Sequence, residues 1–176
     1  MDDTNNYSRT ELQRQTAEWL LREECNAMVT LTFSGEKGVS YQFAEKAFGS
    51  FTHKLKCRLF GRNSKKRIRM CPIVEDFGGE QMWSTSAQGV RRGTHINCLM
   101  RLPGDPMDYK EVVRNLWCSS GELCGDPNVN CPNSSDWFVD ISNEQDRREV
   151  THYVLKKCAQ DIDGVLVKFM PTRSAI

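Results

Sequence analysis

The order in which helix-like and strand-like patterns follow one another constrains the fold of this chain most strongly. Runs of apolar and β-branched residues between turn residues indicate strands, and apolar residues recurring every three or four positions indicate amphipathic helices. The predicted elements are a helix at 9–24, a strand at 27–33, a helix at 44–59 ending at Gly61, strands at 67–75 and 94–102, a helix at 108–117, a strand at 136–141, a helix at 144–160 and an additional strand at 165–170.

The element order, a helix followed by β-α-β-β-α-β and a last helix, predicts an α+β fold. We expect the ferredoxin-like or split β-α-β class, with an antiparallel sheet of four to five strands and helices on one face. The other face would be free to carry a site. The length of 176 residues fits one domain, 1–176, with 1–26 as a short helical extension.

The composition is that of a soluble protein, with 39% hydrophobic and 27% charged residues. No apolar run is long enough to span a membrane, and the polar start of the chain does not resemble a secretory signal. We therefore expect a cytoplasmic protein, or a nuclear one in a eukaryotic host, with eight reduced cysteines. Cys118, Cys124 and Cys131 share a loop but lack the close pairing of a zinc module, so ordinary loop and core cysteines are favoured.

The charge is segregated along the chain although the net charge is only +1. Nine Lys and Arg residues and no acid lie between Lys46 and Val74, and Arg91 and Arg92 follow before the 94–102 strand. A local basic surface suits binding to a phosphate backbone. A solvated helix face with a Lys-rich loop explains the same run equally well.

Three polar side chains at two predicted neighbouring strands form a candidate metal site. His95 and Asn97 point to the same side of their strand because side chains alternate with a period of two. Glu75 ends the preceding strand and comes close to them if the two strands pair as a hairpin. One nitrogen and two oxygen donors suit Mg²⁺ or Mn²⁺. Each residue alone has a simpler explanation as an ordinary strand residue.

A tyrosine on the last predicted helix is the candidate nucleophile. Tyr153 lies three and four positions before Lys156 and Lys157, so these side chains are neighbours on a helix. A cation that polarises a phosphodiester, together with attack by Tyr153, would form a phosphotyrosine link to DNA. Lys156 or Lys157 could lower the pKa of the phenol or hold a phosphate oxygen.

These motifs together resemble the HUH endonuclease superfamily, in particular the replication initiator (Rep) proteins of rolling-circle plasmids, phages and small single-stranded DNA viruses. The segment 28–33 is similar to the first family motif, 73–78 and 91–97 to the acidic strand and the metal motif, and 153–156 to the catalytic Tyr-x-x-Lys motif. The resemblance covers about 27–160. Asn97 departs from it, since the family usually has His or Gln at that position.

The resemblance implies a metal-dependent, site-specific single-stranded DNA nickase and strand transferase that initiates rolling-circle replication. Tyr153 would be the single catalytic tyrosine assisted by Lys156, with Glu75, His95 and Asn97 as ligands of Mg²⁺ or Mn²⁺. The expected partners are single-stranded DNA or an origin hairpin, and a host helicase. The residues expected to contact DNA are Thr30, Thr32, Lys54, Arg58, Lys65, Lys66, Arg67, Arg69, Arg91, Arg92 and Lys157.

Two alternatives remain open. A catalytically weakened or inactive Rep-like protein would bind DNA without cleaving it, and the shorter side chain of Asn97 favours this reading. A transposase of the same superfamily would share the chemistry and differ in biological context.

Overall fold

The computed structural model of the chain describes residues 18, 22, 24–34, 39–75, 94–130, 137–158 and 166–170. Of residues 130, 152–158 and 167 it describes the backbone alone. Within the predicted helix at 9–24, Glu18 and Arg22 are helical and Glu24 lies in a turn. The predicted 76–92 connection lies outside the described residues. No helix in the described ranges is long and apolar enough to cross a membrane.

Four strands form one antiparallel sheet. They are β1 (Ala27–Thr32), β2 (Met70–Glu75), β3 (His95–Met100) and β4 (Phe138–Asp140), in the order β2-β3-β1-β4. All three neighbouring pairs are antiparallel. The first and third strands are therefore central, and the prediction of a ferredoxin-like α+β fold is confirmed.

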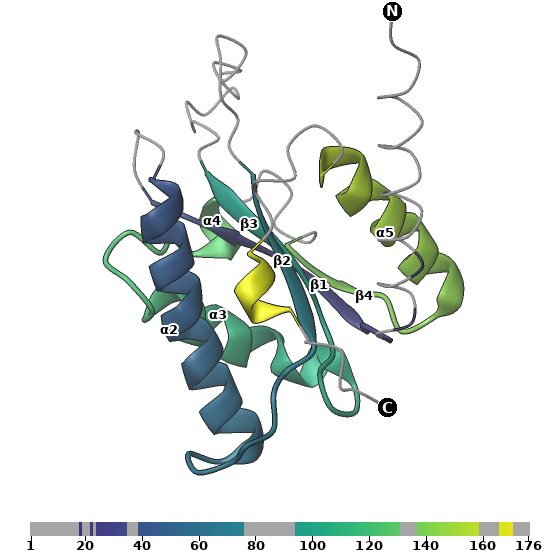
Figure 1. Ribbon diagram of the computed structural model, residues 1–176, viewed down its shortest axis with the longest axis horizontal. Helices are drawn as coiled ribbons and strands as arrows, with labels where there is room; N and C mark the ends of the chain where they lie inside the picture. The colour runs from purple at the N-terminus through teal and green to yellow at the C-terminus, as the bar shows by residue number, and fades with distance from the viewer. Residues whose placement is uncertain are drawn as a thin grey trace, which may run out of the picture.

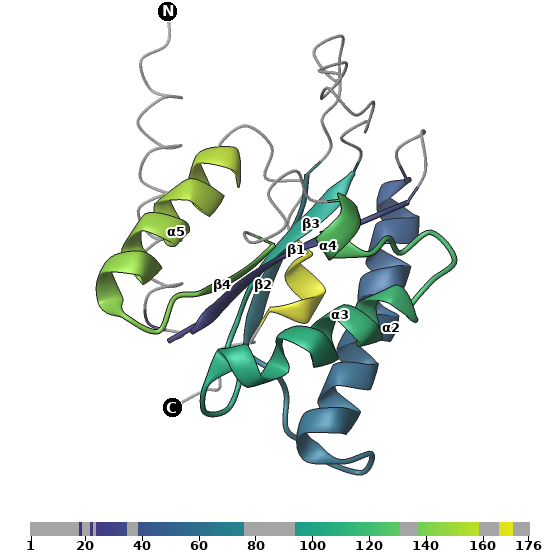
Figure 2. The same cartoon turned by 180° about the vertical axis from the view of Figure 1, so that it is seen from behind.

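Helices lie on both sides of this sheet, as Figures 1 and 2 show from opposite directions, so the expectation of helices on one face with the other face free is wrong. The helices α2 (Tyr41–Phe60) and α3 (Lys110–Cys118) cover one side, which we call face A. The helix α5 (Glu144–Cys158) lies on the other side, face B. Short helical segments η2 (Pro106–Tyr109), α4 (Pro127–Asn130) and η4 (Val167–Phe169) complete the described structure.

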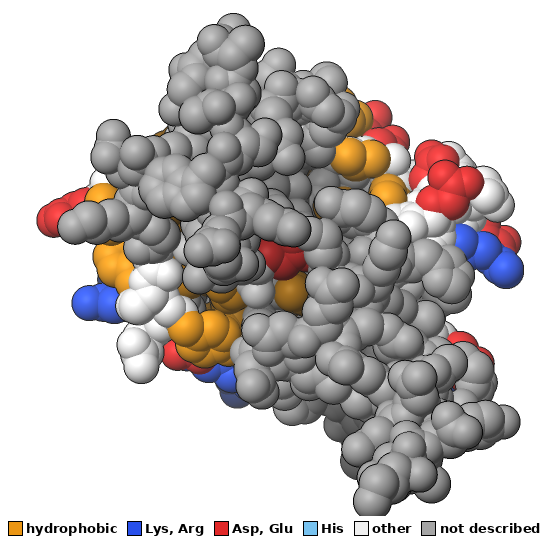
Figure 3. All heavy atoms as spheres, turned by 90° about the horizontal axis from the view of Figure 1, so that it is seen from above, with side chains coloured by type: hydrophobic (Ala, Val, Ile, Leu, Met, Phe, Trp, Pro, Cys, Tyr) orange, Lys and Arg blue, Asp and Glu red, His pale blue; other side chains and the backbone are white. Residues whose placement is uncertain are grey.

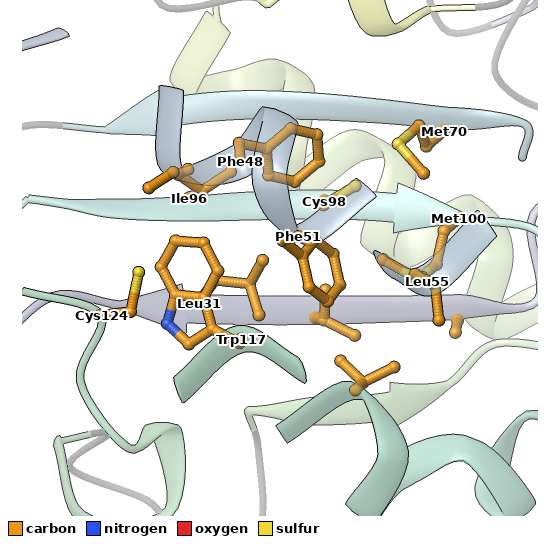
Figure 4. Packing of buried hydrophobic residues seen from close by; sticks show 14 of the residues in the cluster. Leu31, Phe48, Phe51, Leu55, Met70, Ile96, Cys98, Met100, Trp117 and Cys124 are labelled. Carbon is orange, nitrogen blue, oxygen red and sulfur yellow. The ribbon is translucent and has the colours of Figure 1, made fainter. Parts of the chain in front are cut away.

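Helix α2 builds the core against face A. Its start is capped by Ser40, whose hydroxyl accepts from the Phe43 amide at 3.2 Å, and it ends at Gly61, whose φ of 86° only glycine adopts readily. The fully buried Phe48, Phe51 and Leu55 recur at helical spacing and point onto the strands (Figure 4). Burial of this apolar stripe fixes which side of α2 faces the sheet.

Alternation along the strands decides which side chains reach face B. Residues such as Leu31, Ile96 and Cys98 belong to the core on face A. The residues next to them in each strand therefore point to face B. These face B residues form two groups along the strands. The apolar group is Met28, Cys71, Ile73 and Leu99; the polar group is Thr30, Thr32, Glu75, His95 and Asn97.

The apolar group anchors α5 on face B. It forms one cluster with Ile141, and Val150 of α5 packs against that cluster. The outer side of α5 carries charged residues, including Arg148, which donates to Glu144 one turn earlier at 2.5 Å. Figure 3 shows side chains of both charge signs on the surface at this edge of the molecule. In the described side chains of α5, Val150 thus packs toward the sheet and the charged residues lie outward.

The prediction of an additional strand at 165–170 is wrong. Val167–Phe169 is a 3₁₀ helix, although the Leu166 amide does donate to the carbonyl of Pro72 on the edge strand β2 at 3.1 Å. The carbonyl of Pro72 faces away from β3, and proline has no amide hydrogen to return a bond to a fifth strand. The segment after α5 therefore meets the outer edge of β2 through this hydrogen bond, and a β-ladder with β2 cannot continue past Pro72.

Candidate functional site

The polar group on face B brings together the three predicted metal ligands. In the register of the sheet, Glu75 lies opposite His95 across β2 and β3. The His95 Nε2 atom lies 3.1 Å from Glu75 Oε2 and 3.4 Å from Asn97 Nδ2. Their exposed fractions are 9% for Glu75, 8% for His95 and 2% for Asn97. The hairpin pairing expected from the sequence thus places a carboxylate, an imidazole and an amide in one buried cluster.

A fourth member of this cluster comes from β1. Thr30 lies directly opposite Asn97, and the Thr30 hydroxyl donates to Asn97 Oδ1 at 2.8 Å. Sequence reasoning assigned Thr30 to DNA contact and missed this bond. The spacing of Thr30 and Thr32 gives both the same face, but only the register of β1 against β3 identifies Asn97 as the partner.

The cluster contains a mismatch around His95 Nε2. A ring nitrogen carries either a proton or a lone pair, so Nε2 cannot donate to Glu75 and also accept from the Asn97 amide group. A half-turn of the Asn97 amide removes the conflict, because a protonated Nε2 can then donate to both oxygens. The same half-turn would offer a divalent cation the Glu75 oxygen, the His95 lone pair and the Asn97 amide oxygen. The donor set therefore fits Mg²⁺ or Mn²⁺ once the Asn97 oxygen turns inward.

The composition of the candidate ligand set follows from the side chains of the cluster. Among the described residues, no three His, Cys, Asp or Glu side chains are grouped to hold a metal ion. Glu75 and His95 supply two such groups, and the third donor is the Asn97 amide.

The end of β1 beside this cluster is held by the loop after α3. Thr32 donates through its hydroxyl to the Gly125 carbonyl at 3.5 Å, and its own carbonyl accepts from the Trp117 indole at 2.8 Å. Phe33 pairs with Cys124 through an isolated bridge. The hydroxyl of Thr32, a predicted DNA contact, is thus engaged with this loop.

The predicted last helix forms as α5, and it carries the three residues proposed for catalysis and phosphate binding. Tyr153, Lys156 and Lys157 lie on α5, which covers face B, and their side chains lie outside the described part of the chain. Thr151, two positions before Tyr153, is buried. Arg91 and Arg92 also lie outside the described residues.

The other predicted DNA contacts lie away from the cluster. Lys54 and Arg58 are on α2, which packs on face A, and Lys54 donates to the backbone and hydroxyl of Ser119 at 2.6 and 3.1 Å. The linker from α2 to β2 enters β2 at Met70, whereas Glu75 ends that strand, a separation of about 17 Å. This linker carries the exposed residues Lys65, Lys66, Arg67 and Arg69 (bottom of Figure 1). The structure does not bring these cations to the Glu75–His95–Asn97 cluster.

The cysteine loop is partly described. Cys124 is buried against the core on face A, and burial together with the nearby Cys118 raises the pKa of its thiol to about 12. Cys118 is exposed, and its pKa is raised by partial burial and then by Asp126. Cys131 lies outside the described residues. These two thiols therefore stay protonated near neutral pH in the metal-free chain.

Comparisons of the chain with protein-family models, with curated proteins and with solved structures found no match.

Proposed function

We propose that this chain is a divalent-metal-dependent nickase and strand transferase for single-stranded DNA, acting in the initiation of rolling-circle replication as HUH Rep proteins do. The observation that carries the proposal is the Glu75–His95–Asn97 cluster, buried on the same sheet face that α5 covers. Burial of a carboxylate, an imidazole and an amide in contact costs free energy unless they are satisfied. A metal-binding role accounts for their being kept together.

The metal would be held by Glu75 Oε2, His95 Nε2 and the amide oxygen of Asn97. When bound, Mg²⁺ or Mn²⁺ polarises the scissile phosphate and stabilises charge on the departing oxygen. His95 and Asn97 lie on the central strand β3, and the register of β2 against β3 would hold Glu75 opposite His95 at the sheet edge.

In the proposed reaction Tyr153 supplies the nucleophile. Its phenol loses a proton to solvent, the bond from its oxygen to phosphorus forms, and the bond from phosphorus to O3′ breaks. The released strand takes a proton from water and ends in a 3′-hydroxyl, which can prime synthesis. Attack by another 3′-hydroxyl on the phosphotyrosine would rejoin DNA and complete strand transfer. Lys156, one turn after Tyr153, would favour the phenolate or hold a phosphate oxygen.

In this proposal the substrate reaches face B as a single strand or as the unpaired part of an origin hairpin. The strand would approach the end of the sheet where Thr30 and the metal ligands lie. The cations of the α2–β2 linker would hold a more distant part of the DNA. We further propose that a host helicase supplies the single strand, in the cytoplasm of a bacterial host of a plasmid or phage, or in the nucleus for a eukaryotic virus.

A denaturing gel tests the proposal. The protein is incubated with labelled single-stranded oligonucleotides that carry a randomised segment, with Mn²⁺ or Mg²⁺. We expect a labelled covalent adduct that disappears with a chelator, with Tyr153→Phe and with His95→Ala. Tyr41→Phe is the matched control, because Tyr41 is exposed at the start of α2 on the opposite side of the sheet.

A binding-only protein is the second candidate, and the orientation of Asn97 favours it. The amide presents nitrogen, not oxygen, to His95 in the structure. Tight DNA binding without an adduct in any metal would support that candidate and contradict nicking.

A further inference from the structure

The bond between Thr30 and Asn97 is a consequence of the sheet register. The Thr30 amide donates to the Trp137 carbonyl at 2.7 Å, so the polar backbone groups of Thr30 face away from β3. Thr30 and Asn97 are therefore a non-hydrogen-bonded pair of β1 and β3, the kind in which facing side chains are closest. The Asn97 oxygen can only accept, so the Thr30 hydroxyl is the donor in this 2.8 Å contact.

This bond determines which end of the Asn97 amide faces His95. With its oxygen held by Thr30, Asn97 presents Nδ2 to His95 Nε2 at 3.4 Å. An amide nitrogen does not bind Mg²⁺ or Mn²⁺, which prefer oxygen. A half-turn of the terminal side-chain torsion exchanges the two ends, and this torsion has two nearly equivalent states.

Thr30 can serve both states of the amide. A hydroxyl donates to the oxygen in the orientation seen here, and it accepts from Nδ2 after the half-turn. Asn97 is only 2% exposed. Without the Thr30 hydroxyl, the amide atom that faces Thr30 would lose its hydrogen-bond partner, and water could not take its place.

The geometry points to Thr30 as a positioning residue for the metal site: after the half-turn its hydroxyl would accept from Asn97 Nδ2 and so hold the amide oxygen toward a divalent cation. The inference rests on the proposed function, because it assumes that the cluster binds Mg²⁺ or Mn²⁺. Residues that orient a ligand in this way typically change metal affinity by about 10–100-fold when removed.

Mn²⁺ binding to the DNA-free protein tests the inference without any nicking step. Free Mn²⁺ is titrated by electron paramagnetic resonance against the wild type, Thr30→Val and Thr30→Ser. We expect Thr30→Val, which keeps the shape but removes the hydroxyl, to weaken binding by about tenfold or more. Thr30→Ser should bind within about threefold of the wild type, because it keeps the hydroxyl.

Thr52→Val is the matched control. It makes the same chemical change at a half-buried site on α2, where the hydroxyl donates to the Phe48 carbonyl on face A, and it should bind Mn²⁺ as the wild type does. Circular dichroism reports whether each variant is folded, and Thr30→Ala replaces Thr30→Val if the latter is not.

Two different outcomes would overturn the inference. Wild-type Mn²⁺ binding that a folded Thr30→Val or Thr30→Ala variant retains in full would refute the role of Thr30 and leave the metal site standing. Absence of Mn²⁺ binding in the wild type would refute the metal site and the inference together.

Discussion

At the scale of single residues, buried polar groups are satisfied by partners distant in sequence. Asn26, just before β1, donates to the Leu102 carbonyl at 2.9 Å and accepts from the Leu102 amide at 2.8 Å. Its side chain thus extends the pairing of β1 with β3 by one step beyond the backbone ladder. The Asn97 amide is bonded from β1 as well, by the side chain of Thr30.

Asn26→Ala should lower the free energy of unfolding by about 2–3 kcal/mol, because it leaves the buried amide and carbonyl of Leu102 without their partner. Urea denaturation measures the change. Asn63→Ala, in the exposed turn after α2, is the control and should change stability little. A small effect at Asn26 would mean that water replaces its bonds.

Asp126 should make stability depend on pH in the acid range. The Arg114 guanidinium donates to both carboxylate oxygens, at 2.9 and 2.5 Å, and lowers the pKa of Asp126 below its ordinary value. A carboxylate with a lowered folded-state pKa stabilises the protein above its unfolded-state pKa, and this contribution disappears as the pH falls through the folded-state pKa.

The urea midpoint of the wild type should therefore exceed that of Asp126→Asn near neutral pH, and the gap should close in acid. A gap that stayed constant down to the most acidic point would show that the difference is not due to the charge of Asp126.

At the scale of elements, local patterns predicted the order of the four strands and of the helices α2, α3 and α5, but not the structure of the segment after α5. Helix α2 follows from its apolar spacing and Gly61. The 3₁₀ helix within 165–170 could not be predicted from the sequence, because the apolar residues of this segment resemble a strand. The position of Pro72 at the sheet edge, which prevents strand pairing, is known only from the structure.

Two glycines of this region should respond oppositely to alanine. Gly61 has φ 86° and ψ 156°, a conformation essentially restricted to glycine, so Gly61→Ala should cost about 1–3 kcal/mol. Gly49 lies inside α2, and a Cβ there would meet Phe169 at an ordinary 3.5 Å, so Gly49→Ala should stabilise by about 0.5–1 kcal/mol. Thermal or urea unfolding distinguishes the signs, and destabilisation by Gly49→Ala would contradict the packing described here.

At the scale of the whole molecule, the sheet separates a structural side from a candidate functional side. The sequence predicted that Glu75, His95 and Asn97 would meet, because the pairing of two strands in a hairpin and the alternation of side chains between the two sheet faces are enough to bring them together. It could not place the basic residues, since a run of charge does not tell which end of the sheet its linker occupies. The role of Thr30 also depended on a register that alternation alone leaves open.

The cations of the α2–β2 linker should contribute to affinity and not to chemistry. Replacing Lys65, Lys66 and Arg67 by Ala should reduce the salt dependence of single-stranded DNA binding by a slope of up to about 2, since each phosphate contact contributes about 0.7. Adduct formation at saturating protein should not change. Arg148→Ala removes an exposed cation already paired with Glu144 and is the control. Loss of the adduct in the triple variant would place these residues at the reacting phosphate.

The central claim is that Tyr153 becomes covalently joined to DNA, and peptide mass spectrometry tests it most directly. The adduct formed with Mn²⁺ is trimmed with nuclease and digested with trypsin, which releases residues 149–156 with Tyr153 as their one tyrosine. We expect this peptide to carry the added mass of a nucleotide at Tyr153. An unmodified peptide from a protein that has cleaved DNA, or a nucleotide attached to a different residue, would contradict the account.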